Sequence, residues 1–369
     1  MVRSQTRVFY LDAARAAAIA LVALNHAVNR TWNNYSWVQE EFVRISRLST
    51  GLKALLTVAS RYGVPLFLMI TGALILSRPF DSRESVRRFY RHNWLRLLIT
   101  GEIWTFLGYW FLVFVEPGSR VLADGGIGGA VLGCVKTMLF LDPVRFDSMW
   151  YLPMILCIYL LLPMLAWLLQ GFPEPRALLY PMIGVFLCDM LVPAVNAGLS
   201  LLALPTLHFA VFDYYFPSSY LLYVLAGWWI CRGGLGRLSD RAVVLSAALS
   251  YLLCVGLQFL CYSRSEHLLS YMSPGILLSS ALVFECFRRY AGGLLRWEKP
   301  ITAMSRAAFA LYLLHIFFNM SFHWYVDFSA WSRSAKVLFL EIVPLALSGL
   351  VIWPLAKIPF FRKYVFLIK

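Results

Sequence analysis

The chain has 369 residues, of which 60% are hydrophobic and only 14% are charged, and its mean hydropathy is +0.68. Soluble domains carry about a quarter charged residues, so this composition excludes an ordinary soluble protein and indicates a polytopic membrane protein. The net charge of +14 is concentrated in segments between apolar runs, which is typical of cytoplasmic loops, so we expect a bilayer and no nucleic acid as partner.

The first apolar run, FYLDAARAAAIALVALNHAV, contains Asp12 and Arg15. A cleavable signal has an uninterrupted apolar region and a small-residue cleavage site, so we expect this run to stay as the first span. Ten runs in all are long enough to cross a bilayer, which predicts an all-α protein with one membrane domain over residues 1–369. The predicted spans are 8–28, 55–77, 94–115, 149–170, 177–199, 216–231, 242–262, 269–287, 301–320 and 337–356.

Charge decides the orientation of these spans. With ten spans and both termini in the cytoplasm, most of the 33 Lys and Arg residues fall on the cytoplasmic side. The short, glycine-rich run 126–141 contains Lys136, and we expect it to be a re-entrant or surface helix. The seven cysteines lie mostly in apolar runs and are interpreted as small apolar side chains.

The first span carries one ionisable group near each end. Arg15 and His26 are eleven residues apart, which on a helix is about 16–17 Å and about three turns, so both lie on one face. Asp12 lies one turn before Arg15. Each side chain taken alone is more simply interpreted as reaching toward the nearest headgroups. Because ionisable groups within spans are rare and usually line cavities, the shared face favours a site.

The spacing suits a phosphate-bearing cofactor. Guanidinium groups bind phosphate, and imidazole is suited to general-base catalysis, so Arg15 could hold coenzyme A at the cytoplasmic mouth while His26 meets its thioester. Arg61 in the second span and His315 in the ninth are predicted at the depth of His26, with Tyr312 one turn from His315. The alternatives are that Arg61 reaches the outer surface and that His315 is a satisfied core residue.

Further candidates lie at the two predicted surfaces. Among the arginines of SRESVRRFYRHNWLRLL, Arg96 is the best candidate to join Arg15 at the coenzyme's phosphates; the others suit anionic lipid. Trp150 fits an aromatic belt at the outer surface, or with Asp147 could line an acceptor entrance. The six histidines show no metal-binding spacing, so no metal site and no permanently bound cofactor are expected.

Four stretches in order resemble the family 3 membrane acyltransferases, the bacterial O-acetyltransferase-like group. They are YLDAARAAAIALVALNH, SRYGVPLFLMITGALIL, MWYLPMILCIYLLLPML and SRAAFALYLLHIFF. The resemblance implies transfer of an acyl group, most commonly acetyl, from cytoplasmic acyl-coenzyme A to a hydroxyl of an envelope glycan or lipid-linked saccharide. It implies a multi-pass protein of the bacterial inner membrane, with His26 and Arg15 as its essential residues.

Two other functions fit some of these observations. A proton-coupled exporter of a glycan or small polar solute would use His26 and His315 as proton relays. The absence of a visible internal repeat counts mildly against a transporter. A structural scaffold would leave Arg15 and Arg61 within spans unexplained, so acyl transfer is the leading hypothesis, with a catalytic set of His26, Arg61 and His315, a coenzyme set of Asp12, Arg15 and Arg96, and acceptor contacts at Trp150 and Tyr312.

Overall fold

The computed structural model describes residues 8–32, 46–123, 125–142, 146, 149–171, 179–202, 204–205, 220–263 and 269–368. None of these residues forms a strand, and seven helical runs among them are long and apolar enough to cross a membrane. The predicted all-helical, multi-pass membrane architecture is therefore confirmed. The count of ten spans and the cytoplasmic position of both termini stay predictions.

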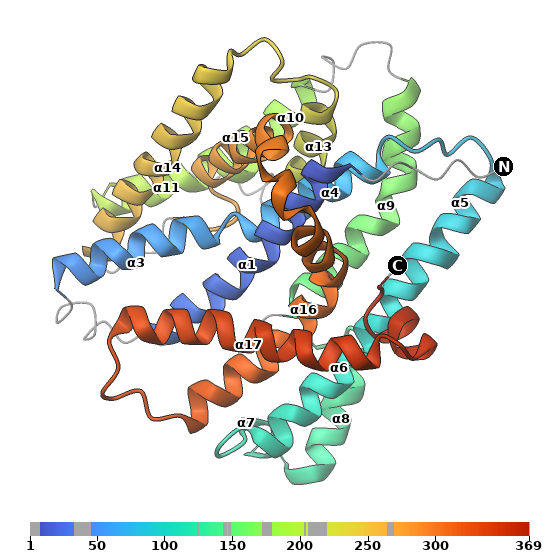
Figure 1. Ribbon diagram of the computed structural model, residues 1–369, viewed down its shortest axis with the longest axis vertical. Coiled ribbons are helices and arrows are strands. Elements are labelled where there is room, and N and C mark those ends of the chain that lie inside the picture. The colour runs from blue at the N-terminus through green and yellow to red at the C-terminus, as the bar shows by residue number, and fades with distance from the viewer. Residues whose placement is uncertain are drawn as a thin grey trace. The chain divides into compact units, whose positions relative to one another are not determined.

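The chain divides into two compact units. Unit 1 comprises Met1–Arg78 and Leu168–Ser305, and unit 2 comprises Pro79–Trp167 and Arg306–Lys369. The helices α9 (Tyr151–Gly171) and α16 (Glu298–Tyr325), which are labelled in Figure 1, contribute residues to both units. Unit 1 also contains α1 (Phe9–Thr31), α3 (Arg47–Ser60), α4 (Gly63–Ile75), α10 (Leu179–Val185), η3 (Phe186–Leu191), α11 (Val192–Leu201), α13 (Tyr220–Cys231), α14 (Asp240–Ser263), α15 (Pro274–Tyr290) and η4 (Ala291–Trp297).

Helix α1 lies in the core of unit 1, where it packs against α3, α4, α15 and η4. Its alanines make this position possible: Ala14, Ala18, Ala23 and Ala27 are fully buried. Small side chains let neighbouring helices approach closely, which is how helices associate where lipid offers no hydrophobic driving force. The helix predicted to carry Arg15 and His26 is thus enclosed by protein along most of its length.

The second predicted span is two helices. Helix α3 ends at Ser60 and α4 begins at Gly63, although the two together still form one apolar run long enough to cross a bilayer. The break follows from Pro65, which has no N–H to donate to the carbonyl of Arg61 and whose ring would clash with that carbonyl in a continuous helix. The helical path therefore breaks at Arg61 and Tyr62.

Helices α4 and α13 pack backbone to backbone. A Cβ atom on Gly72 would overlap the carbonyl oxygen of Val224, and one on Gly227 would overlap the carbonyl oxygen of Met69. Each glycine thus admits the partner helix at a distance that no side chain would allow. This contact joins the second half of the broken span to α13.

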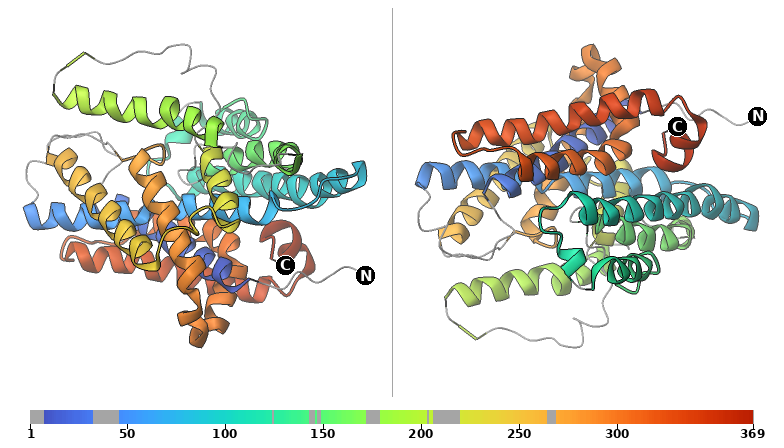
Figure 2. Two further views of the ribbon diagram at one scale, coloured as in Figure 1. Left: turned by 90° about the horizontal axis from the view of Figure 1, so that it is seen from above. Right: turned by 90° about the horizontal axis from the view of Figure 1, so that it is seen from below.

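Unit 2 is built around α6 (Leu95–Val115), which continues α5 (Arg83–Phe89) through a π-helical turn, η1 (Tyr90–Trp94). The indole of Trp104 donates to the carbonyl of Val365 at 2.8 Å, which ties α6 to the C-terminal turn η5 (Phe361–Val365). Phe111, Phe146 and Phe317 form an aromatic cluster beside this contact. Helix α6 also packs against α7 (Arg120–Ala123) and α8 (Gly126–Met138) (Figure 2).

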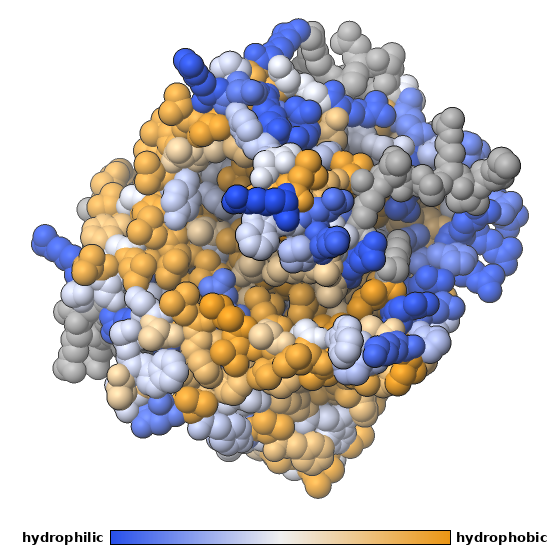
Figure 3. Space-filling model, in the orientation of Figure 1, coloured by the Kyte–Doolittle hydropathy of each residue, from blue (hydrophilic) through white to orange (hydrophobic). Residues whose placement is uncertain are grey.

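The outward faces of several helices are apolar. Exposed leucines cover α14, and α17 (Arg333–Leu355) exposes Leu338, Ile342, Leu350 and Trp353. The surface over these two helices is largely hydrophobic in Figure 3. Large apolar patches on a soluble protein would promote association, whereas here they suit contact with lipid tails.

Replacement of Gly227 by valine is expected to destabilise the protein by about 1–3 kcal/mol or more, because the new side chain would be forced into the backbone of α4. Thermal unfolding of the purified protein in detergent would measure this change. Gly256→Ala in α14 is the matched control, since no atom lies near its added Cβ and alanine favours helix. Equal melting temperatures for Gly227→Val and the wild type would contradict the packing described.

Candidate active site

At one end of α1 a hydroxyl joins a carboxylate to a guanidinium. The side chain of Ser305 in α16 donates to Asp12 Oδ1 at 2.7 Å and accepts from Arg15 Nη1 at 3.2 Å. Arg15 Nη1 also lies 3.5 Å from Asp12 Oδ1. Asp12 is 3% exposed, whereas the Arg15 side chain is 27% exposed. The buried partners thus fix the orientation of a guanidinium that solvent still reaches.

The helix itself places Asp12 and Arg15 together, because residues three apart are neighbours on one face. The sequence predicted this pair but assigned no role to Ser305, which lies immediately before Arg306 in the ninth predicted span. Only the fold brings this hydroxyl to α1, since 290 residues separate it from Arg15. Ser305 is the member of this hydrogen-bonded group that the sequence did not indicate.

The other end of α1 is polar and buried. His26 is 6% exposed, and Asn25, Asn29 and Arg30 beside it are each at most 8% exposed. Ser60, the last residue of α3, donates to Asn25 Oδ1 at 3.2 Å. The stretch LNHAVNR indicates a polar environment in the sequence itself, because it places four polar residues within six positions of an apolar run. Buried polar side chains need polar neighbours.

Arg61 follows Ser60 and caps α3. Its guanidinium carbon lies 5.0 Å from the ring centroid of Tyr271. Ser60 and Asn25 are hydrogen-bonded to each other. Arg61 follows Ser60 in the chain, and His26 follows Asn25. Arg61 therefore lies at the His26 end of α1.

His315 belongs to unit 2 and is fully buried in α16. Its Nδ1 lies 2.8 Å from the carbonyl of Leu311, and a carbonyl can only accept, so Nδ1 carries a proton and Nε2 is the basic nitrogen. Tyr312 packs against His315 and against Tyr151. The predicted convergence of His315 with His26 and Arg61 stays a prediction, because the latter two belong to unit 1.

The remaining predicted residues also lie in unit 2. Arg96 is half-buried in α6, one turn after the half-buried Asn93, whose side chain bonds to the carbonyl of Phe89. Trp150 is half-buried with its ring edge-on to Tyr151. Asp147 lies outside the described residues. Among the residues that are described, no three His, Cys, Asp or Glu side chains gather so that they could hold a metal ion.

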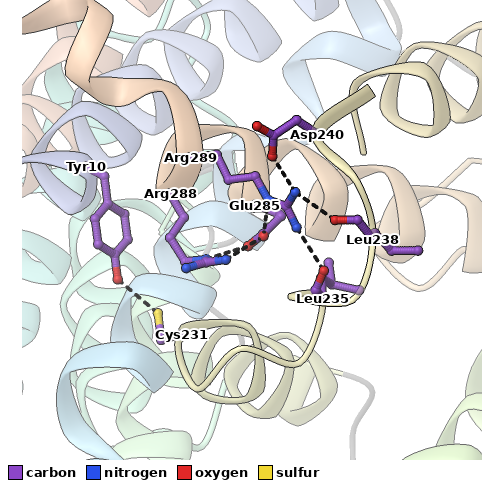
Figure 4. Close-up of polar contacts among 8 residues, drawn as sticks. All are labelled: Tyr10, Cys231, Leu235, Leu238, Asp240, Glu285, Arg288 and Arg289. Atoms are coloured by element: carbon purple, nitrogen blue, oxygen red, sulfur yellow. Dashed lines mark hydrogen bonds and ion pairs between the residues drawn. The ribbon is translucent and has the colours of Figure 1, made fainter. Parts of the chain in front are cut away.

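A charged network holds the helix ends of unit 1 near the start of α1 (Figure 4). Glu285 of α15 is fully buried and accepts from the guanidinium groups of Arg288 and Arg289, at 2.5–2.7 Å. Arg289 also bonds to Asp240 and to two carbonyls of the turn after α13, those of Leu235 and Leu238. Arg289, held by Glu285 within α15, thus ties this helix to the turn between α13 and α14.

A separate contact beside this network reaches α1 (Figure 4). Tyr10 Oη lies 3.1 Å from Cys231 Sγ at the end of α13, and the ring of Tyr10 packs edge-on against Phe284. Tyr10 is five residues before Arg15 in α1. The ends of α13 and α15 therefore position the part of α1 that carries Asp12 and Arg15.

Glu285→Gln is expected to lower the free energy of unfolding by about 1.5–3 kcal/mol, because hydrogen bonds to two cations lose their buried anionic partner. Thermal unfolding in detergent would report the change. Arg241→Gln serves as the control, since Arg241 is exposed in the first turn of α14. A Glu285→Gln protein as stable as Arg241→Gln would show that the network contributes no stability.

The sequence model of a family described as an acyltransferase domain matches residues 8–356, which is nearly the whole chain. No curated protein and no solved structure matches the chain.

Proposed function

The chain belongs to this acyltransferase family, and we propose that it moves an acyl group, most commonly acetyl, from cytoplasmic acyl-coenzyme A to a hydroxyl of an envelope glycan or lipid-linked saccharide. The observation that carries the proposal is on α1. Arg15 is oriented by Asp12 and Ser305, and His26 lies buried on the same helix face eleven residues later. A phosphate site and a base are thereby held on one rigid element.

The acyl donor is proposed to bind at the end of α1 that carries Arg15. A guanidinium binds phosphate through its planar set of donors, and the buried Asp12 and Ser305 hold it in place. Arg96 is proposed to contact a second phosphate. About 16–17 Å of helix separate Arg15 from His26, a length comparable to the extended pantetheine arm, so the thioester would reach the imidazole.

The reaction at His26 is proposed as direct transfer. The imidazole takes the proton of the acceptor hydroxyl, the oxygen attacks the thioester carbonyl, and the carbon–sulfur bond breaks to release the coenzyme A thiolate, which takes up a proton. Arg61 or His315 would stabilise the negative charge that develops on the carbonyl oxygen. In an alternative mechanism His26 first takes the acyl group from coenzyme A and then passes it to the hydroxyl, with the same overall products.

The acceptor is proposed to approach from the opposite side of a bacterial inner membrane. Trp150 and Tyr312 are aromatic side chains of unit 2 that could contact a saccharide. Aromatic rings combine a large apolar face with a polar tip, which suits both sugars and the membrane surface. Donor and acceptor would thus meet inside the protein without either crossing the bilayer.

Arg15→Ala and His26→Ala are expected to fail in different ways. Acetyl-coenzyme A should raise the melting temperature of the wild type and of His26→Ala, whereas Arg15→Ala should lose this shift because its phosphate contact is gone. Arg237→Ala, at an exposed arginine in the turn after α13, is the control that keeps the shift. A shift of wild-type size in Arg15→Ala would contradict the donor site.

Glycan mass spectrometry of a deletion strain tests the reaction itself. An envelope glycan should lose the mass of one acyl group per modified residue. Wild-type protein should restore that mass, and His26→Ala should not, because the hydroxyl would have no base. Restoration by His26→Ala to the wild-type level would remove His26 from the mechanism. An unchanged glycan profile, together with proton-dependent export of a solute, would replace acyl transfer by transport.

A further inference from the structure

Helix α3 presents a polar stripe in which two cations are two helical turns apart. Lys53, Thr57 and Arg61 are spaced by four residues, so they follow one another along one side of the helix. Lys53 is 1% exposed and Thr57 is 3% exposed. Eight residues of helix separate the two cationic positions by about 12 Å.

Tyrosines of the same unit hold this stripe. Lys53 Nζ lies 4.3 Å from the ring centroid of Tyr262, whose hydroxyl lies 3.0 Å from Thr57 Oγ1. Arg61 faces the ring of Tyr271, and the hydroxyl of Tyr223 donates to the backbone carbonyl of Tyr271. The ring face of Tyr271 attracts Arg61 but carries no formal negative charge.

The charge of Arg61 is not neutralised by the described part of the chain. Among the described residues no carboxylate forms an ion pair with Arg61, and its Nε atom is buried without a hydrogen-bond acceptor. A charged side chain within a membrane span is costly, and such groups are offset by partners or by substrate. An anion bound at Arg61 would supply both the missing charge and the missing acceptor atoms.

The stripe lies at the end of the proposed site that contains His26, the proposed general base. Ser60 bonds to Asn25, and the neighbours of these two residues are Arg61 and His26. A single oxyanion formed on the thioester would engage one cation only, because about 12 Å of helix separate the positions of Lys53 and Arg61. A row of two cations instead matches a ligand that carries permanent negative charge along its length.

We propose that the stripe Lys53, Thr57 and Arg61 binds an anionic saccharide acceptor, with its carboxylate or phosphate groups on the two cations and its reacting hydroxyl at His26. The inference rests on the proposed acyl transfer and names the acceptor's chemical class. Thr57 supplies a neutral hydroxyl between the charges, suited to a sugar hydroxyl. In this arrangement Arg61 binds the acceptor. His315 remains the candidate for stabilising the negative charge that develops on the thioester oxygen.

Three matched probes test the inference without coenzyme A. They are a glucuronate-containing oligosaccharide, the same oligosaccharide with its carboxyl groups reduced to alcohols, and the reduced oligosaccharide carrying a phosphate. The purified wild type should bind at least one charged probe about thirtyfold or more tightly than the neutral one. The charged probe that binds better identifies carboxylate or phosphate as the source of the negative charge. Equal affinity for all three, or binding of neither charged probe, overturns the inference.

Substitutions connect that preference to the stripe. Arg61→Gln should lose the preference for the charged probe, and Arg61→Lys should keep part of it because the charge remains. Arg47→Gln, at the exposed first residue of α3, should keep all of it. If Arg61→Gln fails to fold, Lys53→Met gives the same test, with an expected loss of about tenfold or more. A preference unchanged in the folded variant, Arg61→Gln or otherwise Lys53→Met, contradicts the site.

Failure of this inference is distinguishable from failure of the proposed function. Binding of the probes needs no acyl donor, whereas transfer of labelled acetyl from acetyl-coenzyme A reports the reaction. A wild type that acylates the neutral oligosaccharide as fast as the charged ones retains the acyltransferase function and loses the anionic acceptor. A wild type that binds charged probes selectively but transfers no acyl group retains the anion site and loses the proposed reaction.

Discussion

The cost of placing ionisable groups inside a bilayer governs how this protein is built. Helix α1 carries Asp12, Arg15 and His26 in a run that is otherwise almost entirely apolar. In hydrocarbon such groups would cost several kcal/mol each unless neighbouring groups offset the charge. Polar partners lie at both ends of α1. Ser305 and Asp12 contact the guanidinium of Arg15, and the hydrogen-bonded side chains of Asn25 and Ser60 lie at the end that carries His26. Ser60 of α3 and Ser305 of α16 supply two of these polar partners.

Close packing makes that arrangement possible. The fully buried alanines of α1 let α3 and α4 come near enough for Ser60 to reach Asn25. Near the start of α1, the Glu285 network ties α15 to the turn after α13, while Tyr10 connects α1 to α13. The polar contacts of α1 therefore depend on small side chains and on a charged network at the helix ends.

The class of fold could be predicted from the sequence because the bilayer sets both the hydropathy and the length of a membrane-spanning helix. The sequence also predicted the Asp12 and Arg15 pair, because helical spacing is local. It did not predict Ser305 or Ser60 as partners, since their contacts join residues 290 and 35 positions apart. The break between α3 and α4 could be anticipated only as a bend at Pro65, because the sequence does not say whether a proline kinks a span or ends a helix.

The glycines of α4 and α13 have a mechanical consequence. Where two backbones touch without side chains between them, a shift of one helix by a single residue along its axis would bring a Cβ into the other backbone. Sliding of α4 past α13 is therefore blocked, and the pair moves as one piece. Any opening that admits a substrate beside Arg61 therefore leaves α4 and α13 in place relative to each other.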